Sequence, residues 1–198
     1  LDGAGKGENG LSIARNKDFK ALIRNMGTIE DSDYEIPGQL DGIMREYQKS
    51  GYRWLRTLKE NGFSGILADD MGLGKTLQVL ALLLSGTEQR KTLIVCPATL
   101  VYNWAAEIRR FTPEIHDVLV VGTQEERRKL IEGAGENDVL VTSYDLLKRD
   151  IAFYNKIPFY TEILDEAQYI KNASTQVAHA VKKIEAQHLP TVDEAFIK

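Results

Sequence analysis

The sequence predicts an α/β domain in which a parallel β-sheet carries helices on both faces. Short runs of apolar and β-branched residues recur along the chain, and segments with helical periodicity separate them. A glycine-rich loop ending in Gly-Lys-Thr follows one of these runs, and an Asp-Glu pair follows a later one. Ligands of open parallel sheets bind at the carboxyl ends of the strands, so both placements agree with this fold class.

The first part of the chain is predicted to be an extension. Residues 1–37 are mostly polar and could form one short amphipathic helix. Pro37-Gly38 is typical of a turn in a connector. From Ile43 onward, apolar residues recur at roughly helical spacing. Asn61-Gly62 is expected to end that helix.

Strands and helices then alternate. The predicted strands cover residues 65–69, 92–96, 117–122, 138–143 and 159–165. The predicted helices cover residues 75–85, 100–111, 124–132 and 174–186, and a helix or turn covers 144–154. This alternation predicts βαβ units, and hence one α/β domain. Residues 189–198 do not continue it and are interpreted as a tail, a short extra element or a join after a missing piece.

Composition narrows the class of protein. The 198 residues are 43% hydrophobic and 27% charged, which is typical of a soluble globular domain. The longest apolar runs, such as residues 79–84, are too short to span a bilayer, and the opening residues lack the apolar core of a signal peptide. We therefore expect a cytoplasmic protein with no membrane partner. Cys96 is the single cysteine, which excludes an internal disulfide.

The net charge of -4 argues against a protein that coats nucleic acid by bulk charge. A local basic track remains open, because lysines and arginines occur in small clusters that could equally lie on solvated helix faces. These clusters contain Arg53, Arg56 and Lys59, then Arg109 and Arg110, then Arg127, Arg128 and Lys129, then Lys148 and Arg149.

The loop "DDMGLGKT" at residues 69–76 is a candidate phosphate-binding loop. Asp69 stands where the first glycine of the common pattern would be. The chemistry needs backbone N–H groups at a helix start, a lysine that reaches the outer phosphates and a hydroxyl that binds Mg²⁺. Gly72 and Gly74 supply flexible points, and Lys75 and Thr76 supply the two side chains. The sequence therefore predicts a nucleotide site despite the altered first position.

The stretch "ILDEAQYIKN" supplies a second set of groups. Asp165 is expected at the carboxyl end of a strand, where it would hold Mg²⁺, mainly through water. Glu166 would position or deprotonate the attacking water. The alternative is a solvated acidic turn, but the loop at Lys75 far upstream makes a paired nucleotide site the stronger interpretation.

Four stretches follow one another along the chain: "DDMGLGKT", "LIVCPATLVYNW", "DVLVTSYDLL" and "ILDEAQYIKN". Together they resemble the first RecA-like lobe of the Swi/Snf-type ATPases of helicase superfamily two, with a bacterial character. The resemblance covers roughly residues 38–188. It implies a RecA-like P-loop domain of three α/β/α layers, and in this family an aspartate at the position of Asp69 is normal.

The resemblance implies roles for individual residues. Gln48 would read adenine, and Gln168 would couple the nucleotide to the rest of the enzyme. Catalysis would rest on Lys75, Asp165 and Glu166, and Mg²⁺ on Thr76 and Asp165. The implied ATP contacts are Gln48, Asp70, Met71, Gly72, Leu73, Gly74, Lys75, Thr76 and Gln168.

Two segments resemble motifs that touch the nucleic-acid backbone. The implied contacts are Pro97, Thr99 and Asn103 in the first segment, and Thr142, Ser143 and Tyr144 in the second. Trp104 in the first segment is more simply interpreted as a core residue on a helix face. Ser143 or Asp145 could instead cap a helix, and capping and contact can hold together.

The implied function is an ATP-binding motor lobe of a DNA-dependent ATPase that moves along double-stranded DNA, with ATP and Mg²⁺ as cofactors. A Thr-Gly-Thr-Pro-like motif and the second lobe are absent from these residues, so we expect weak nucleotide binding and poor turnover by the chain alone. Further partners could include DNA-bound proteins or polymerase, in the nucleoid if the source is bacterial. Two alternatives stay open: a relative acting on RNA or single strands, and a nucleotide-dependent switch or scaffold.

Overall fold

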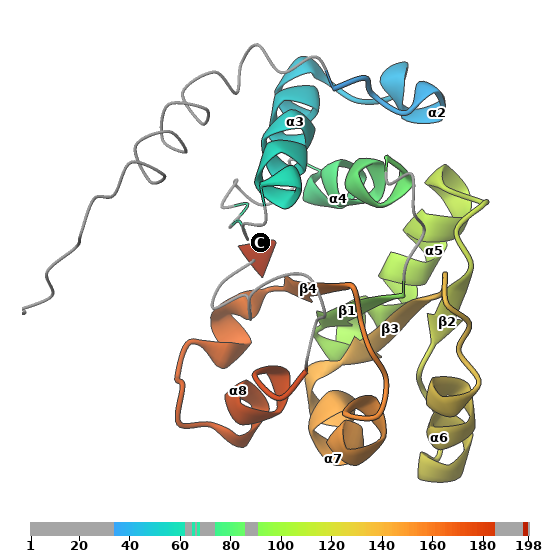
Figure 1. Ribbon diagram of the computed structural model, residues 1–198, viewed down its shortest axis with the longest axis vertical. Coiled ribbons are helices and arrows are strands. Elements are labelled where there is room, and N and C mark those ends of the chain that lie inside the picture. Colours follow the sequence, from blue (N-terminus) through green and yellow to red (C-terminus); the bar gives the residue numbers. More distant parts are fainter. Residues whose placement is uncertain are drawn as a thin grey trace, which may run out of the picture.

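The computed structural model describes residues 34–61, 65, 67, 74–85, 91–184 and 196–197. Its centre is a parallel sheet whose strands lie in the order β2-β3-β1-β4-β5 (Figure 1). The strands are β1 Thr92–Cys96, β2 Asp117–Leu119, β3 Val139–Ser143, β4 Thr161–Asp165 and β5 Phe196–Ile197. The predicted parallel sheet is confirmed.

The strand register brings distant parts of the chain to one edge of the sheet. β1 pairs with β3 through Cys96 and Ser143, and with β4 through Val95 and Leu164. Because the strands are parallel, the residues that follow Cys96, Ser143 and Asp165 all emerge at the carboxyl edge. This is the edge at which the sequence predicts a site.

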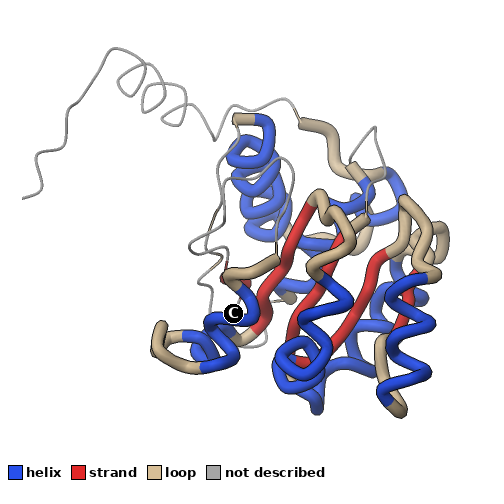
Figure 2. Tube along the Cα trace, turned by 60° about the horizontal axis from the view of Figure 1, so that its bottom comes forward, coloured by secondary structure: helices blue, strands red, loops and turns tan. Residues whose placement is uncertain are grey.

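Helices cover both faces of the sheet, which confirms the three-layer α/β/α arrangement (Figures 1 and 2). The helices α3, α4 and α5 share a core with one face, and α6, α7 and α8 share a core with the other. The α-helices are α2 Gly38–Asp41, α3 Glu46–Glu60, α4 Lys75–Leu84, α5 Val101–Phe111, α6 Gln124–Glu132, α7 Tyr144–Tyr154 and α8 Gln176–Val181, and two 3-10 turns are η2 Ala98–Leu100 and η3 Ala167–Ile170.

The two cores follow from side-chain alternation along the strands. On β1, Ile94 and Cys96 face the α3, α4 and α5 side, while Leu93 and Val95 face the other. All of these side chains are fully buried, as expected for a parallel sheet covered on both faces. Burial of each such aliphatic side chain contributes about 1.5–3 kcal/mol.

Several predicted boundaries were wrong. β2 ends at Leu119 rather than residue 122, because the chain turns at Gly122 with φ 99°. β4 begins at Thr161 rather than residue 159, and α8 ends at Val181 rather than residue 186.

The connector holds the short helix α2, whose first turn closes on the Pro37 carbonyl. The segment at 144–154 is a helix, not a turn.

Some predictions lie outside the described residues. They include the helix expected within residues 1–33 and most of the strand at 65–69, of which Leu67 is described as a buried bridge residue. Within residues 189–198, β5 joins the sheet beside β4, so this part of the tail forms a short extra element. Among the helices described, none is both long and apolar enough to cross a membrane.

Candidate functional site

The end of the predicted phosphate loop leads directly into a helix. Gly74 precedes α4 with φ 68° and ψ 44°, a left-handed conformation that favours glycine. Lys75 and Thr76 open the helix, Lys75 only 9% exposed and Thr76 half-buried. The start of a helix presents N–H groups and a positive dipole end, which suits phosphate. The first residue of α4 is Lys75, which confirms the predicted helix start.

Gln48, on α3, reaches this loop. Its Nε2 donates to the Gly74 carbonyl at 3.3 Å, and its Oε1 accepts from the Arg45 backbone N–H at 2.9 Å. The side chain is 5% exposed. The predicted adenine-reading residue is thus tied to the last glycine of the loop and to the cap of its own helix.

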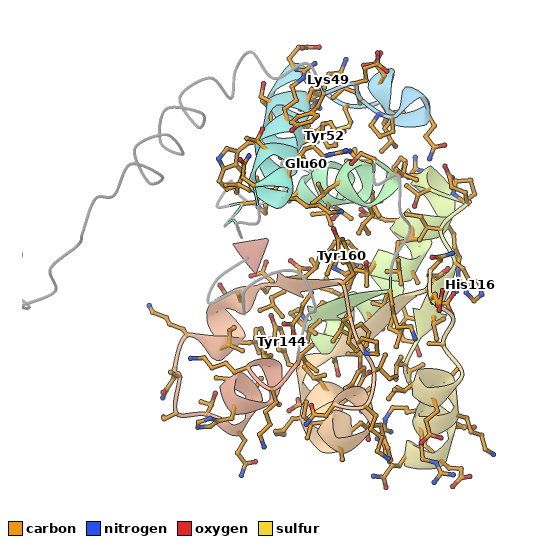
Figure 3. The ribbon with its side chains drawn as sticks, in the orientation of Figure 1. Lys49, Tyr52, Glu60, His116, Tyr144 and Tyr160 are labelled. Carbon is orange, nitrogen blue, oxygen red and sulfur yellow. The ribbon has the colours of Figure 1, made fainter. Side chains whose placement is uncertain are left out.

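Asp165 is held from two sides at the carboxyl edge. The Trp104 indole Nε1 on α5 donates to Asp165 Oδ2 at 2.9 Å. The Tyr144 hydroxyl at the start of α7 donates to the Asp165 carbonyl at 2.9 Å. Tyr144 lies on the α7 and α8 side of the sheet, while Tyr52 lies on α3 across it (Figure 3). Side chain and backbone of Asp165 are therefore anchored to different layers.

Electrostatics connects Asp165 to the loop. Burial raises the pKa of Asp165 above its usual range, and the Glu166 charge raises it further. The hydrogen bond from Trp104 and the Lys75 ammonium both lower this pKa. The Lys75 charge is the smallest of these influences on the pKa of Asp165, and it acts between residues that are far apart in sequence. The charge of the predicted phosphate-binding lysine therefore acts on the predicted metal-binding carboxylate.

Glu166 has an unusual backbone. Its φ of 53° and ψ of 49° are left-handed. Among the described residues, Glu166 is the single residue other than glycine with a positive φ. A side-chain-bearing residue in this region costs about 1–3 kcal/mol and is frequent at functional sites. Glu166 is half-buried, and Gln168 is exposed on η3. The strained turn directs the chain from β4 into η3 directly after the carboxylate pair.

The donor set fits Mg²⁺ with a nucleotide. Across the part of the chain that the structure describes, no group of three or more His, Cys, Asp or Glu side chains could hold a metal by itself. Mg²⁺ differs from metals held in full protein cages because it is usually bound by one or two carboxylates together with substrate phosphates and water. A half-buried Asp165 carboxylate and a Thr76 hydroxyl at a helix start match that requirement.

The two segments predicted to contact nucleic acid emerge side by side, since Cys96 pairs with Ser143. Their side chains differ in exposure. Thr99 and Asn103 are exposed, whereas Pro97 is buried. Thr142, Ser143 and Tyr144 are at most 3% exposed.

This burial assigns internal roles to the second segment. Ser143 Oγ accepts from the Leu146 N–H at 3.3 Å and caps α7, as the capping alternative predicted. Thr142 Oγ1 donates to the Val120 carbonyl at 3.5 Å. Side-chain contact with nucleic acid is therefore a stronger prediction for Thr99 and Asn103 than for Thr142 and Tyr144.

Sequence reasoning missed how the site is supported. It identified Trp104 as a core residue, which its 4% exposure confirms, but not its bond to Asp165. It did not single out Tyr169, which is 55% exposed and stacks on Tyr144 with centroids 5.3 Å apart. An aromatic residue shortly after the Asp-Glu pair was the available signal. Asp70, Met71, Gly72 and Leu73 lie outside the described residues.

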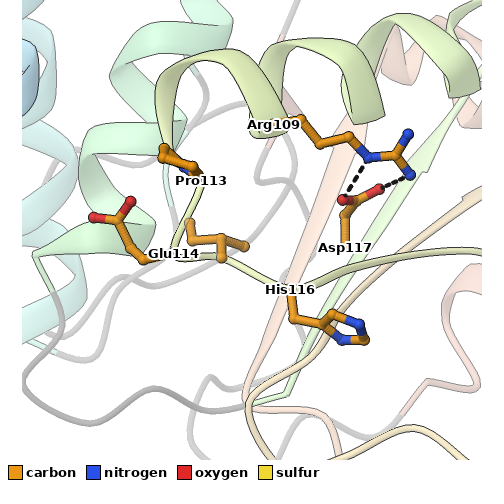
Figure 4. Close-up of a pocket in the computed structure, with 6 residues that line it drawn as sticks. Arg109, Pro113, Glu114, His116 and Asp117 are labelled. Carbon is orange, nitrogen blue, oxygen red and sulfur yellow. Dashed lines mark hydrogen bonds and ion pairs between the residues drawn. The ribbon is translucent and has the colours of Figure 1, made fainter.

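A separate surface pocket of about 530 Å³ lies beside the start of β2 (Figure 4). Arg109 and Asp117 form a two-bond ion pair at its rim, with N–O distances of 2.9 and 2.8 Å. His116 bonds Asp138 at 2.8 Å. Since β2 begins here, the pocket lies at the amino edge of the parallel sheet, opposite the edge that carries Asp165.

Comparison with known proteins identifies relatives. The family model described as the SNF2-related domain matches residues 47–190. YwqA of Bacillus subtilis, named as an ATP-dependent helicase/translocase, is 36% identical over 90% of this chain and 20% of its own length. The TATA-binding protein-associated factor BTAF1 of Arabidopsis thaliana is 37% identical over 87% of this chain and 9% of its own length.

A solved structure agrees with these relatives. The Sulfolobus solfataricus SWI2/SNF2 ATPase core in complex with double-stranded DNA matches with a TM-score of 0.65 and 32% identity, over 78% of this chain and 32% of that one. The chain therefore spans a minor part of each of these relatives. The family match covers well over half of the chain and includes Lys75 and Asp165, so the chain belongs to the SNF2-related domain family.

Proposed function

We propose that this chain is the ATP-binding lobe of a DNA-dependent ATPase that moves along double-stranded DNA. The observation that carries the proposal is that Lys75 opens a helix directly after Gly74, while Asp165 ends β4 at the carboxyl edge of the sheet, near enough for the Lys75 charge to lower its pKa. A lysine for phosphate and a carboxylate for metal at one sheet edge are the groups that nucleotide hydrolysis needs.

Each group has a part in the reaction. Lys75 neutralises the outer phosphates, and the helix start at Gly74 offers backbone N–H groups to them. Thr76 and Asp165 hold Mg²⁺, which screens the phosphate charge when bound. Glu166 orients the attacking water or accepts its proton. Gln48, Asp70, Met71, Gly72, Leu73 and Gln168 complete the proposed ATP contacts.

The proposed lobe extends over residues 38–188 and works with a second RecA-like lobe supplied by the same parent protein. An arginine from that lobe would stabilise charge on the transferred phosphoryl group, a contribution that is large in related enzymes. Thr99 and Asn103 would contact the DNA backbone, which carries little sequence information, so we propose low sequence specificity. Support for DNA comes from the duplex bound by the Sulfolobus relative.

The test is Mg²⁺-ATP turnover by the full-length protein with no polymer, duplex DNA, single-stranded DNA or RNA, with Lys75→Ala as the inactive control. We expect the largest stimulation by duplex DNA and its loss in Lys75→Ala. Turnover that ignores every polymer would support the nucleotide-switch alternative, which relatives named as helicases do not favour. Robust hydrolysis by these 198 residues alone would contradict the need for a second lobe.

A further inference from the structure

The hydrogen bond from Trp104 to Asp165 joins two segments that are 61 residues apart. Trp104 lies in the first half of α5, which follows β1 in the chain. Asp165 is the last residue of β4, the strand that pairs with β1. The Trp104 side chain is 4% exposed and packs in the core shared by α3, α4 and α5. Packing fixes the ring, and the ring aims a single donor at the carboxylate.

The chemistry of this bond is directional. An indole N–H donates only, so it has no alternative role as an acceptor. A hydrogen bond to an ionised carboxylate is roughly twice as strong as one between neutral groups. With the Tyr144 hydroxyl on the Asp165 carbonyl, both the side chain and the backbone of this residue are restrained. The carboxylate is therefore oriented before any ligand arrives.

We propose that Trp104 is a positioning residue that holds the Asp165 carboxylate in the orientation needed to bind Mg²⁺ with ATP. The inference rests on the proposed function of Asp165. It assigns to Trp104 a role beyond packing, and it places that role one residue after Asn103, which is a proposed DNA contact. The turn of α5 that would meet DNA thus also holds the metal-binding carboxylate.

The test uses Trp104→Phe, which keeps an aromatic ring and removes the N–H. Trp54→Phe is the matched control, because Trp54 is the other tryptophan of the chain and lies half-buried on α3. Calorimetry would measure binding of a non-hydrolysable ATP analogue, once with Mg²⁺ and once with EDTA. Loss of a residue that orients a metal ligand typically lowers metal affinity 10–100-fold, so we expect about tenfold weaker binding with Mg²⁺.

The comparison with EDTA separates positioning from general damage. Binding without metal should be unchanged in Trp104→Phe, and Trp54→Phe should match the wild type in both conditions. Equal Mg²⁺-dependent affinity in Trp104→Phe and the wild type would overturn the inference alone. A full-length wild-type protein that binds the analogue no better than its Lys75→Ala variant would remove the proposed function as well.

Fluorescence provides a second measurement that does not depend on the folding of Trp104→Phe. In Trp54→Phe, Trp104 is the single tryptophan, and its emission reports on the indole beside Asp165. We expect Mg²⁺ with the analogue to shift or quench this emission and the analogue in EDTA to leave it unchanged. Emission that does not respond to bound Mg²⁺ and analogue would overturn the inference.

Discussion

Gln48 Nε2 lies 3.3 Å from the carbonyl oxygen of Gly74 and donates a hydrogen bond to it, so α3 is tied to the end of the predicted phosphate-binding loop. The contact is close: a Cβ added at Gly74 would lie 2.4 Å from the same nitrogen. Gln48 therefore supports the loop backbone directly. Its predicted role as the reader of adenine must be separated from this supporting role.

Nucleotide selectivity separates the two roles of Gln48. Loss of a loop support should weaken ATP and GTP binding alike, whereas loss of an adenine contact should weaken ATP alone. Since its amide is engaged with Gly74 and Arg45, we expect Gln48→Ala to lower both affinities by a similar factor, roughly 3–10-fold. Titrations with each nucleotide measure this, and exposed Gln39→Ala is the control. A selective loss of ATP binding would instead support adenine reading.

Gly51 allows α3 to pack on α4. A Cβ at Gly51 would lie 1.8 Å from Gln78 Oε1, and Gln78 is fully buried, so its amide cannot swing into solvent. We expect Gly51→Ala to lower the free energy of unfolding by about 1–3 kcal/mol, as overpacking does. Without the clash, alanine in a helix would stabilise by about 0.5–1 kcal/mol. Urea unfolding measures the sign, and Gly38→Ala, with open space around it, is the control.

A buried ion pair joins α6 to α7. Arg127 donates two bonds to Asp150, at 2.5 and 2.9 Å, and the Asp150 side chain has no exposure. Removing one partner leaves a buried charge, so we expect Arg127→Leu to destabilise the fold by about 3–5 kcal/mol. Within the part of the chain that the structure describes, the neighbouring Arg128 makes surface pairs alone, at 3.8 and 3.9 Å, and Arg128→Leu should cost about 0–1 kcal/mol. Similar thermal shifts for the two variants would contradict this assignment.

Cys96 should be unreactive in the folded protein. Burial, followed by the Asp165 charge, raises the pKa of its thiol to about 12. The thiolate is the reactive form, so native alkylation by iodoacetamide should stay slow between roughly pH 7 and 9, where an ordinary cysteine accelerates. Because the chain has one cysteine, the mass shift is unambiguous. The denatured chain is the control, and equal native and denatured rates would contradict the burial.

Glu162 should make stability depend on pH. Burial raises the pKa of its carboxyl from 4.5 to about 8, and its Oε1 has no hydrogen-bond partner among the described residues. Between these values the folded state keeps a proton that the unfolded state has lost, so the free energy of unfolding falls as pH rises. Glutamine does not titrate, so the free energy of unfolding of Glu162→Gln should not fall for this reason. Its stability relative to the wild type should therefore increase from pH 5 to pH 9. Exposed Glu132→Gln should show no such trend in urea unfolding.

Much of this fold follows from local sequence. The alternation of apolar runs with helical segments predicted β1, β3, β4, α4, α5 and α6 close to their observed positions, because strand and helix periodicities are properties of neighbouring residues. The same holds for the helix start at Lys75 and for Asp165 at a strand end. Each of these features depends on residue types and spacings within one short stretch.

The contacts that support the candidate site come from long-range packing. The bonds of Trp104 and Tyr144 to Asp165 join separate βα units, and the bond of Gln48 to Gly74 joins separate helices. Such contacts depend on strand order and helix packing, which no local pattern encodes. Packing likewise gives Tyr144, a predicted DNA contact, a bond to the Asp165 carbonyl that its own sequence segment does not indicate. Residue types and their local spacing therefore specify which chemical groups are present and on which element each lies. Packing specifies which of them meet, because long-range contacts form only when the whole sheet is assembled.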